Sequence, residues 1–544
     1  MADRTRRRAY ALIVCVIAIC GLLLGLGGCA RKTPADRAAA LPTDTLFWLR
    51  IDNPPALETS LQRHGVWDLL VAELDRTEVR ETLSETLGVT VSADPAVDLH
   101  TLLASLASID VSLHPPVADA DEADYRFGIR VTAHKEELLA DLAAAAARRA
   151  TATRDLAGAT VHLLTFGEDQ DQTLWVWWAD RTLLAANDGD LLASLHSRLA
   201  RPADAGLAGT TAYRQAQDGK EHDLRLYLSP DFPGAVPTIL RGPAAASLPA
   251  MPSLVEKYGS QALYLGLDYG LTRMVMRATM APDSPLLPLF TYDDRKSRLL
   301  AQLPADTYAC LLQLVQVDAR KAEIFNELLQ DVMAAAPQQE QLPVPVDDPL
   351  AMMETMLGFA LADAALLTTE IAVAGTASLS LLTLLHTESP ADAERLLGML
   401  LSSPALAFLP NAGEREVAGA VLHTYSLPMD PQGRLHGLAR RDQTVMMLIG
   451  AESAADLDAC LAGGAPGLSN ALPPEVRKHL GGSGHGWSYV DIAAMAQAHG
   501  GLLDDIASDL PAPLAQRLRN LVLSARVTAP SPGVAEWVME LGGR

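Results

Sequence analysis

The chain has 544 residues, a formal net charge of −23 at pH 7 and 49% hydrophobic residues. An acidic surface of this kind repels nucleic acid and anionic lipid headgroups, so neither is an expected partner. The length and apolar content are sufficient for two or more domains with buried cores.

The first 28 residues have the parts of a bacterial lipoprotein signal peptide. Arginines at positions 4 and 6–8 precede an apolar run from Ala9 to Leu26. Leu26-Gly27-Gly28-Cys29 then places small residues directly before a thiol, as a lipoprotein signal peptidase requires. The sequence predicts cleavage after Gly28 and attachment of lipid, including palmitate, to Cys29. An uncleaved membrane anchor is the alternative, because the apolar run is long enough to span a bilayer as a helix.

Residues 29–40 are predicted to be a flexible tether, since they are rich in Arg, Lys, Pro and Ala. The expected location is the cell envelope, with the protein anchored to a membrane by its N-terminal lipid and facing the periplasm or the cell exterior. Ala30 follows the cysteine where Asp would indicate retention at the inner membrane, and this favours the outer membrane weakly.

The remainder of the chain contains an internal duplication. Leu41-Pro42-Thr43-Asp44-Thr45 returns as Leu303-Pro304-Ala305-Asp306-Thr307, and residues 106–111 and 180–184 align with 368–373 and 442–446 at the same offset. The sequence therefore predicts copy 1 at 41–297 and copy 2 at 298–544. The charged segment 292–297 is the predicted junction.

The pattern within a copy alternates strands and helices. Expected elements of the first copy, in chain order, are a strand at 45–51, helices within 57–87, a hairpin of 109–113 with 126–133, a helix at 136–149, strands at 160–166, 174–178 and 182–186, and a helix at 190–199. Strands joined by hairpins imply antiparallel pairing. We therefore predict an α+β fold of two tandem copies, each an antiparallel sheet with helices packed on one face.

These motifs also carry a family resemblance. The Leu-Pro-x-Asp-Thr strand that opens each copy, the Gly-Ala-Thr or Gly-Ala-Val strands and the Asp-Arg-Thr-Leu-Leu segment at 180–184 resemble the bacterial envelope proteins grouped as domain of unknown function 3352. The resemblance spans most of the chain after the signal. It implies an exported or anchored protein without assigned chemistry, and it carries over no catalytic residues.

Catalytic motifs for phosphate binding, dinucleotide binding, zinc hydrolysis and serine hydrolysis do not occur in the sequence. Ser483 and His485 lie close together in a glycine-rich stretch, but no nearby carboxylate is placed to orient the histidine. We expect this stretch to be a flexible lead-in to the strand around Tyr489. The acidic turn at 119–124 fails the spacing of an EF-hand and is predicted to be a solvated hairpin tip.

Two histidine pairs recur in both copies, His134 with His386 and His162 with His423. Retained packing or hydrogen bonding is the favoured interpretation over a metal or proton-transfer site. Cys310 and Cys460 are predicted to be buried free thiols, with a bridge between them left open. Trp175, Trp177 and Trp178 occur only in the first copy, where core packing is favoured over a partner-binding patch.

The sequence thus favours a non-enzymatic, lipid-anchored envelope protein that binds an envelope protein partner or acts as a scaffold. The alternative is a carrier or sensor of an apolar or peptidic ligand held in a cleft between the two copies. A hydrolase using His162 or His423 is a third hypothesis. No cofactor, metal site or catalytic residue is predicted, and Cys29 is the one predicted site of attachment.

Overall fold

The computed structural model divides the chain into two compact units. Unit 1 comprises the residues up to Ala281 together with Leu510–Ala515, and unit 2 comprises Pro282–Asp509 and Gln516–Arg544. The structure describes residues 37–543 apart from 64–66, 68–70, 72–99, 102, 118–124, 157–158, 167–171, 201–205, 234, 236–256, 260, 270–272, 319, 322, 325–326, 329–330, 332–360, 408–409, 427–432, 463–466, 500–514 and 517–518. The signal at 1–28, Cys29 and the first part of the tether lie outside the described residues.

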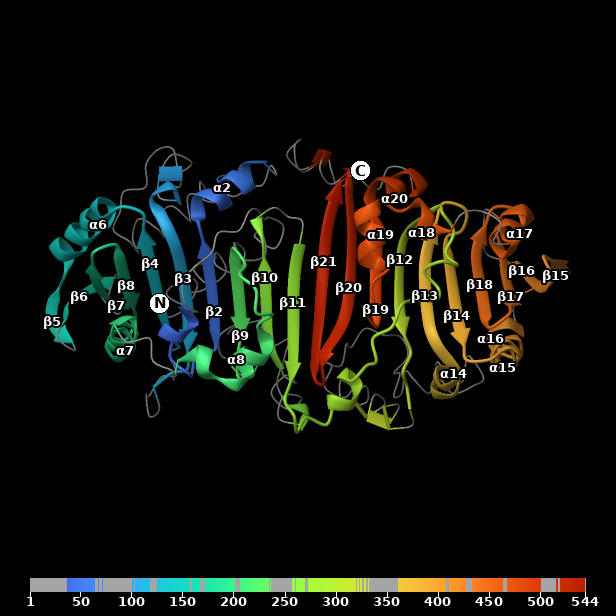
Figure 1. Ribbon diagram of the computed structural model, residues 1–544, viewed down its shortest axis with the longest axis horizontal. Coiled ribbons are helices and arrows are strands. Elements are labelled where there is room, and N and C mark those ends of the chain that lie inside the picture. The colour runs from blue at the N-terminus through green and yellow to red at the C-terminus, as the bar shows by residue number, and fades with distance from the viewer. Residues whose placement is uncertain are drawn as a thin grey trace, which may run out of the picture. The chain divides into compact units, whose positions relative to one another are not determined.

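A single antiparallel sheet forms the centre of unit 1 (Figure 1). Its strands are β2 (Phe47–Asp52), β3 (Leu106–His114), β4 (Arg126–Ala133), β5 (Ala152–Leu156), β6 (Ala159–Phe166), β7 (Gln172–Ala179), β8 (Thr182–Ala186), β9 (Leu224–Leu228), β10 (Gln261–Leu267) and β11 (Arg273–Met280). Their order across the sheet is β5-β6-β7-β8-β4-β3-β2-β9-β10-β11. The predicted pairing of 109–113 with 126–133 is confirmed by the β3–β4 register.

The sheet of unit 2 has the same strand order. Its strands are β12 (Thr307–Leu314), β13 (Thr368–Thr376), β14 (Leu381–Thr387), β15 (Asn411–Val417), β16 (Ala420–Ser426), β17 (Leu435–Arg441), β18 (Thr444–Ala451), β19 (Gly486–Asp491), β20 (Leu521–Ser531) and β21 (Val534–Gly543). They are arranged as β15-β16-β17-β18-β14-β13-β12-β19-β20-β21, again with antiparallel neighbours. The fold is thus mixed α+β with large antiparallel sheets.

Short helices connect the strands. In unit 1 they are η1 (Arg37–Ala40), α2 (Pro54–Arg63), α6 (Glu136–Arg149), α7 (Gly189–Ala200), η2 (Leu207–Gly209) and α8 (Thr211–Ala216). In unit 2 they are η3 (Leu287–Phe290), α14 (Leu361–Leu367), α15 (Pro390–Leu401), α16 (Pro404–Ala407), α17 (Ala454–Ala462), α18 (Leu468–Ala471), α19 (Pro474–Leu480) and α20 (Ile492–His499). No helix within these described residues is both long and apolar enough to cross a membrane.

Helices cover both faces of the sheet, so the prediction of a single covered face was wrong. In unit 1, Ala146 of α6 packs in a cluster with Ala185, whereas α7 packs against the neighbouring residues Leu184 and Ala186. Consecutive strand residues point to opposite faces, so α6 and α7 lie on opposite sides of β8. The physical reason is that β8 is apolar on both faces and needs cover on both. In unit 2, α15 and α17 likewise pack against Val445 and Met446 of β18.

Residues 282–297, which precede β12, belong to unit 2. The boundary predicted from the sequence placed residues up to 297 in the first copy. Arg295 exchanges two backbone hydrogen bonds of 3.0 Å with Gly484. The backbone N–H of Arg298 donates to the Glu370 carboxylate at 2.9 Å. These contacts fix the segment to strands of unit 2.

We expect the free energy of unfolding to depend on the volume of the side chains in the core of unit 2. Leu448 is fully buried in the main core cluster, so Leu448→Ala should lower the free energy of unfolding by about 2–5 kcal/mol. Val421 on β16 is 50% exposed, and Val421→Ala should change it by about 0.5 kcal/mol or less. Urea unfolding of both variants tests this, and equal losses would contradict the assigned core.

Candidate functional site

The register of unit 1 brings four charged residues into one row across four adjacent strands. Arg50 of β2 lies opposite Asp110 of β3 on one side and Arg225 of β9 on the other, and Asp110 lies opposite Arg130 of β4. Directly paired residues in an antiparallel sheet share a face. We call these four residues, with Asp52 two positions after Arg50, the charged row.

Ion pairs link the charged row from end to end. Arg50 Nη1 lies 3.0 Å from Asp110 Oδ1, and Arg130 Nη2 lies 2.7 Å from Asp110 Oδ2. Asp52 accepts hydrogen bonds from Arg50 Nε at 2.8 Å and from Arg225 Nη2 at 3.0 Å. Three guanidinium groups therefore surround two carboxylates, and each carboxylate has two arginine partners.

Three members of the row are buried, with Arg50 1%, Asp110 2% and Arg130 8% exposed, and the side chains of Arg225 and Asp52 are 11% and 16% exposed. Burial alone would raise the pKa of Asp110, but the charges of Arg130 and Arg50 and a hydrogen bond from the Trp48 indole hold it below its usual value. Burial opposes the charge on Arg50 as well, yet Asp110 and Asp52 raise its pKa. The ionised forms therefore persist because they are paired.

The same row in unit 2 is apolar. Leu312 of β12 lies between Ala372 of β13 and Trp487 of β19, and Ala372 lies opposite Leu384 of β14. All four side chains are fully buried. A sheet with this strand order is thus compatible with apolar residues where unit 1 has charges. Since well-packed apolar residues are often at least as stabilising as a buried ion pair, stability alone does not explain the charged row.

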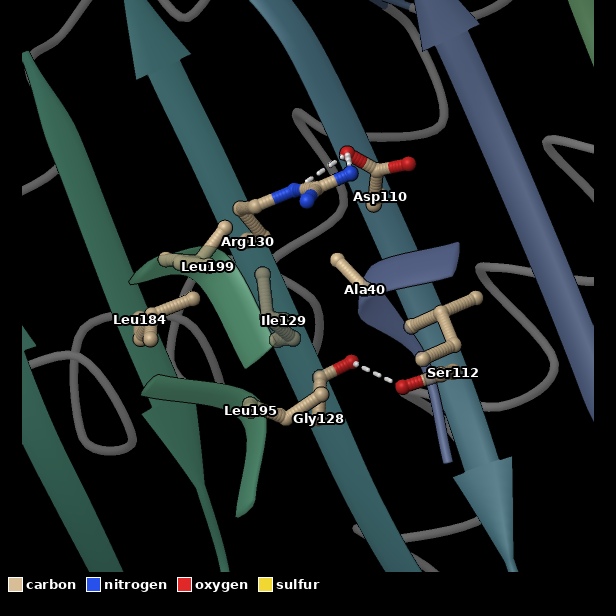
Figure 2. Close-up of a pocket in the computed structure, with 10 residues that line it drawn as sticks. Ala40, Asp110, Ser112, Gly128, Ile129, Arg130, Leu184, Leu195 and Leu199 are labelled. Atoms are coloured by element: carbon tan, nitrogen blue, oxygen red, sulfur yellow. Dashed lines mark hydrogen bonds and ion pairs between the residues drawn. The ribbon is translucent and has the colours of Figure 1, made fainter. Parts of the chain in front are cut away.

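A small cavity adjoins the row beneath α7. Figure 2 shows Asp110 and Arg130 on its polar side, Leu184, Leu195 and Leu199 on its apolar side, and the Ser112 hydroxyl donating to the Gly128 carbonyl at 3.3 Å. Its volume of about 10 Å³ is enough for one water molecule. The cavity therefore supports a hydration site and no larger ligand.

A buried histidine, His222, lies just before β9. Its Nδ1 is 2.9 Å from Asp268 Oδ1 and its Nε2 is 3.0 Å from Asp218 Oδ2, so the doubly protonated ring can donate to both carboxylates. Burial alone would lower the pKa of His222, but the hydrogen bonds to Asp218 and Asp268 and their charges raise it to about 9. The imidazolium therefore joins the residues that follow α8 to those that follow β10.

Asp223 lies beside this histidine. Burial, followed by the charges of Asp268 and Asp52, raises the pKa of Asp223 to about 7. One of its oxygens accepts the backbone N–H of Tyr269 at 2.8 Å, and the Tyr269 hydroxyl donates to the Asp52 carbonyl at 2.6 Å. The histidine cluster and the charged row thus form one continuous polar network. Within the described residues, no group of three or more His, Cys, Asp or Glu side chains has the arrangement of a metal site.

Glycine makes room for His222 on the neighbouring strand. A Cβ at Gly266 of β10 would lie 2.2 Å from the His222 ring. In unit 2 the bulky and the small residue are exchanged between the strands. Gly484 stands at the position of His222, and a Cβ there would lie 2.6 Å from the Val527 carbonyl oxygen and 3.0 Å from Cγ of Arg526 on β20, which takes the position of Gly266.

The glycine-rich stretch around His485 is ordered and paired, so the prediction of a flexible lead-in was wrong. His485 is buried, its Nδ1 lies 2.9 Å from Asp294 Oδ1, and its ring stacks on Tyr292 at 4.1 Å. The carboxylate comes from a segment almost 200 residues away, which local sequence could not reveal. Among the described contacts of His485 there is none with Ser483.

The histidines that recur in both copies have different surroundings in the two units. His162 and His423 occupy equivalent strand positions; His162 stacks on Trp178 at 4.5 Å, and His423 lies 3.0 Å from Glu414. The pairing of His134 with His386 was wrong. His386 lies opposite Glu370 on β13 and Thr444 on β18. The residue in the equivalent place of unit 1 is Thr132, which lies opposite Ser108 and Thr182. The alignment with His134 fails because the second hairpin is eight residues shorter than the first.

The tryptophans pack in the core, as favoured from the sequence. Trp175 and Trp177 contact the cluster beneath α7, and Trp178 contacts the cluster on the opposite face. Cys310 and Cys460 are free thiols, and burial raises the pKa of each to about 12, which keeps both unreactive. Cys29 and the acidic turn at 119–124 lie outside the described residues.

Sequence reasoning missed the charged row, although a signal was present. Arg50 and Asp110 fall inside segments that were expected to be strands, and each aligns with an apolar residue of the second copy, Leu312 and Ala372. A charge in one copy that replaces an apolar core residue in the other indicates a buried ion pair. Identifying its partners requires the strand register.

Comparison with known proteins gives little further information. No family model and no curated protein matches the chain. Three crystal forms of TP0453 are similar to it at 11–12% identity: form I with TM-score 0.25 over 55% of this chain and 99% of that chain, form III with 0.27 over 49% and 91%, and form IV with 0.25 over 45% and 81%. These TM-scores are too low to support a conclusion about fold or function.

Removing one carboxylate of the charged row should be costly. Asp110→Asn removes the carboxylate that pairs with buried Arg130 and leaves Arg50 with Asp52 alone, so we expect the free energy of unfolding to fall by about 3–5 kcal/mol. Glu323→Gln breaks an exposed ion pair with Arg320 and should cost less than about 1 kcal/mol. Denaturant unfolding of the two variants compares them, and similar losses would refute a buried, paired row.

The His222 cluster predicts a stability that falls in alkali. The folded-state pKa of about 9 lies above the unfolded value of 6.5, so the contribution of His222 is complete below pH 6.5 and is lost as pH rises through about 9. The difference corresponds to about 3 kcal/mol.

Unfolding free energies measured between pH 7.5 and 8.5 exclude most of the titration of Asp223 near pH 7 and most of the ionisation of the Cys310 and Cys460 thiols in the unfolded chain near pH 9, both of which have the same sign. His222→Gln should flatten the profile in this window, whereas His423→Gln should retain the wild-type slope. An unchanged slope in His222→Gln would show that another group titrates.

Proposed function

We propose that this protein is a lipid-anchored bacterial envelope protein without catalytic activity, whose two units are tandem copies that bind an envelope protein partner or act as a scaffold. The resemblance to the envelope family called domain of unknown function 3352 is part of this proposal. Cys29 is the proposed lipid attachment site. The outer membrane is the favoured location.

The observation that carries the proposal is the sequence Leu26-Gly27-Gly28-Cys29 after an arginine cluster and an apolar run. Acylation of an N-terminal cysteine by more than one chain gives stable membrane attachment. The short stretch to η1 would then hold unit 1 close to the bilayer surface.

Tandem duplication is supported by three independent features. The sequence repeats at an offset of 262, and the two sheets have the same strand order. Asp180 and Asp442, at this offset, both adopt the left-handed conformation in the turns before β8 and β18. Because few residues other than glycine tolerate this conformation, shared use of Asp supports common descent.

A structural role is supported by the chemistry of the polar groups in unit 1. Each carboxylate of the charged row is held by two arginines, an arrangement that fixes charge in place. The cavity beside the row has room for one water. The network is therefore suited to holding strands together and not to processing a substrate.

Replacement of the acylated cysteine tests this proposal. Cys29→Ser should abolish incorporation of labelled palmitate and block cleavage of the signal peptide, so that the protein accumulates as the larger precursor, because both steps require the thiol. Cys310→Ser, at a buried thiol, is the matched control and should keep both properties. Label retained by Cys29→Ser would refute the assigned site.

A further inference from the structure

Two sheets with one strand order in a single chain create a problem of partner choice. β2 lies between β3 and β9, and β12 lies between β13 and β19 in the same antiparallel sense. Backbone hydrogen bonds are the same for either set of neighbours. Chains with repeated units commonly misassemble by exchanging equivalent elements, so side chains must distinguish the sets.

We propose that the charged row is the device that keeps the strands of unit 1 from pairing with those of unit 2. The row crosses β9, β2, β3 and β4, and its counterpart in unit 2 is apolar at every equivalent place. The two sheets therefore differ in charge just where they agree in backbone geometry.

Exchange of either strand would break the ion pairs that β2 makes with its neighbours. Were β2 to replace β12, Arg50 would keep Asp52 on its own strand, but it would lie between Ala372 and Trp487 and would lose Asp110. Were β12 to replace β2, Leu312 would lie beside Asp110, which would lose Arg50 and the Trp48 indole, and Arg225 would lose Asp52. Loss of a partner from a buried ion pair is strongly unfavourable, whereas the correct pairing gives each carboxylate of the row two arginines.

This role also accounts for a row that stability alone does not explain. Buried polar groups are known to select register and partners in other assemblies, even where apolar residues would be at least as stabilising. Here the apolar version is present in the same chain. The inference uses the proposed duplication only through the shared strand order, so a negative acylation test of Cys29 would leave it standing.

A reporter disulfide can detect the exchanged pairing in the full chain. Leu49 on β2 lies opposite Val111, and Val373 holds the equivalent place on β13. Cysteines at Leu49 and Val373, with the five native cysteines (Cys15, Cys20, Cys29, Cys310 and Cys460) replaced by alanine, should therefore cross-link where β2 pairs with β13. Cysteines at Leu49 and Val111 report the native pairing and serve as the positive control.

The test compares refolding with and without the row. The chain is unfolded in denaturant, refolded in mild detergent under oxidising conditions, and mapped for cross-links by mass spectrometry. With the row intact, the 49–373 cross-link should be a minor product. A neutral variant with Arg50→Met, Asp52→Asn, Asp110→Leu, Arg130→Met and Arg225→Met should raise it by about fivefold or more, since no charge of the row then opposes exchange.

Two further variants keep the result decisive. If the neutral variant does not fold, Arg50→Met with Asp52→Asn neutralises β2 while leaving the Asp110–Arg130 pair intact, and it should also raise the 49–373 cross-link. Leu312→Ala, with the row intact, weakens the core of unit 2 without changing any charge. An unchanged cross-link in the folded neutral variants, or an equal rise in Leu312→Ala, would overturn the proposal.

Discussion

A charge removed from water must find an opposite charge, and the antiparallel register of unit 1 supplies one between β2 and β3 and between β3 and β4, while Asp52 joins the two arginines that lie opposite each other on β2 and β9. Asp110 lies between Arg50 and Arg130 because β3 lies between β2 and β4, and a shift of one residue would turn every one of these side chains to the other face. The same constraint reaches Asp52, Arg225 and the cluster around His222. The polar network and the strand order of unit 1 are therefore mutually dependent.

Unit 2 shows that this strand order does not depend on charged residues in the interior. Leu312, Ala372 and Trp487 fill the positions of Arg50, Asp110 and Arg225 without a change in strand order. The backbone ladder and the helices on both faces thus define the architecture, whereas the residues along one row remain free to diverge. Selection on that row can act on something other than the fold itself.

Local elements with a clear period were predictable from the sequence. The expected helix at 136–149 coincides with α6, and the expected strand at 126–133 lies within the bounds of β4. The partners within the charged row were not predictable from local sequence. Trp48, Arg50 and Asp52 share one face of β2, and this mixture of apolar and charged residues does not reveal whether the face is buried. Only the strand register identifies the opposite charges that make burial of Arg50 tolerable. The Asp294 partner of His485 was hidden for the same reason, since it is distant in sequence.

The contact between His222 and Gly266 couples two positions that are distant in the sequence. His222 lies against Gly266 in unit 1, and Gly484 lies beside Arg526 in unit 2. In unit 1 a side chain on both strands would place two groups in the same space, because a Cβ at Gly266 would meet the His222 ring. A larger residue at position 266 therefore requires a smaller one at position 222, so the two positions can change only together.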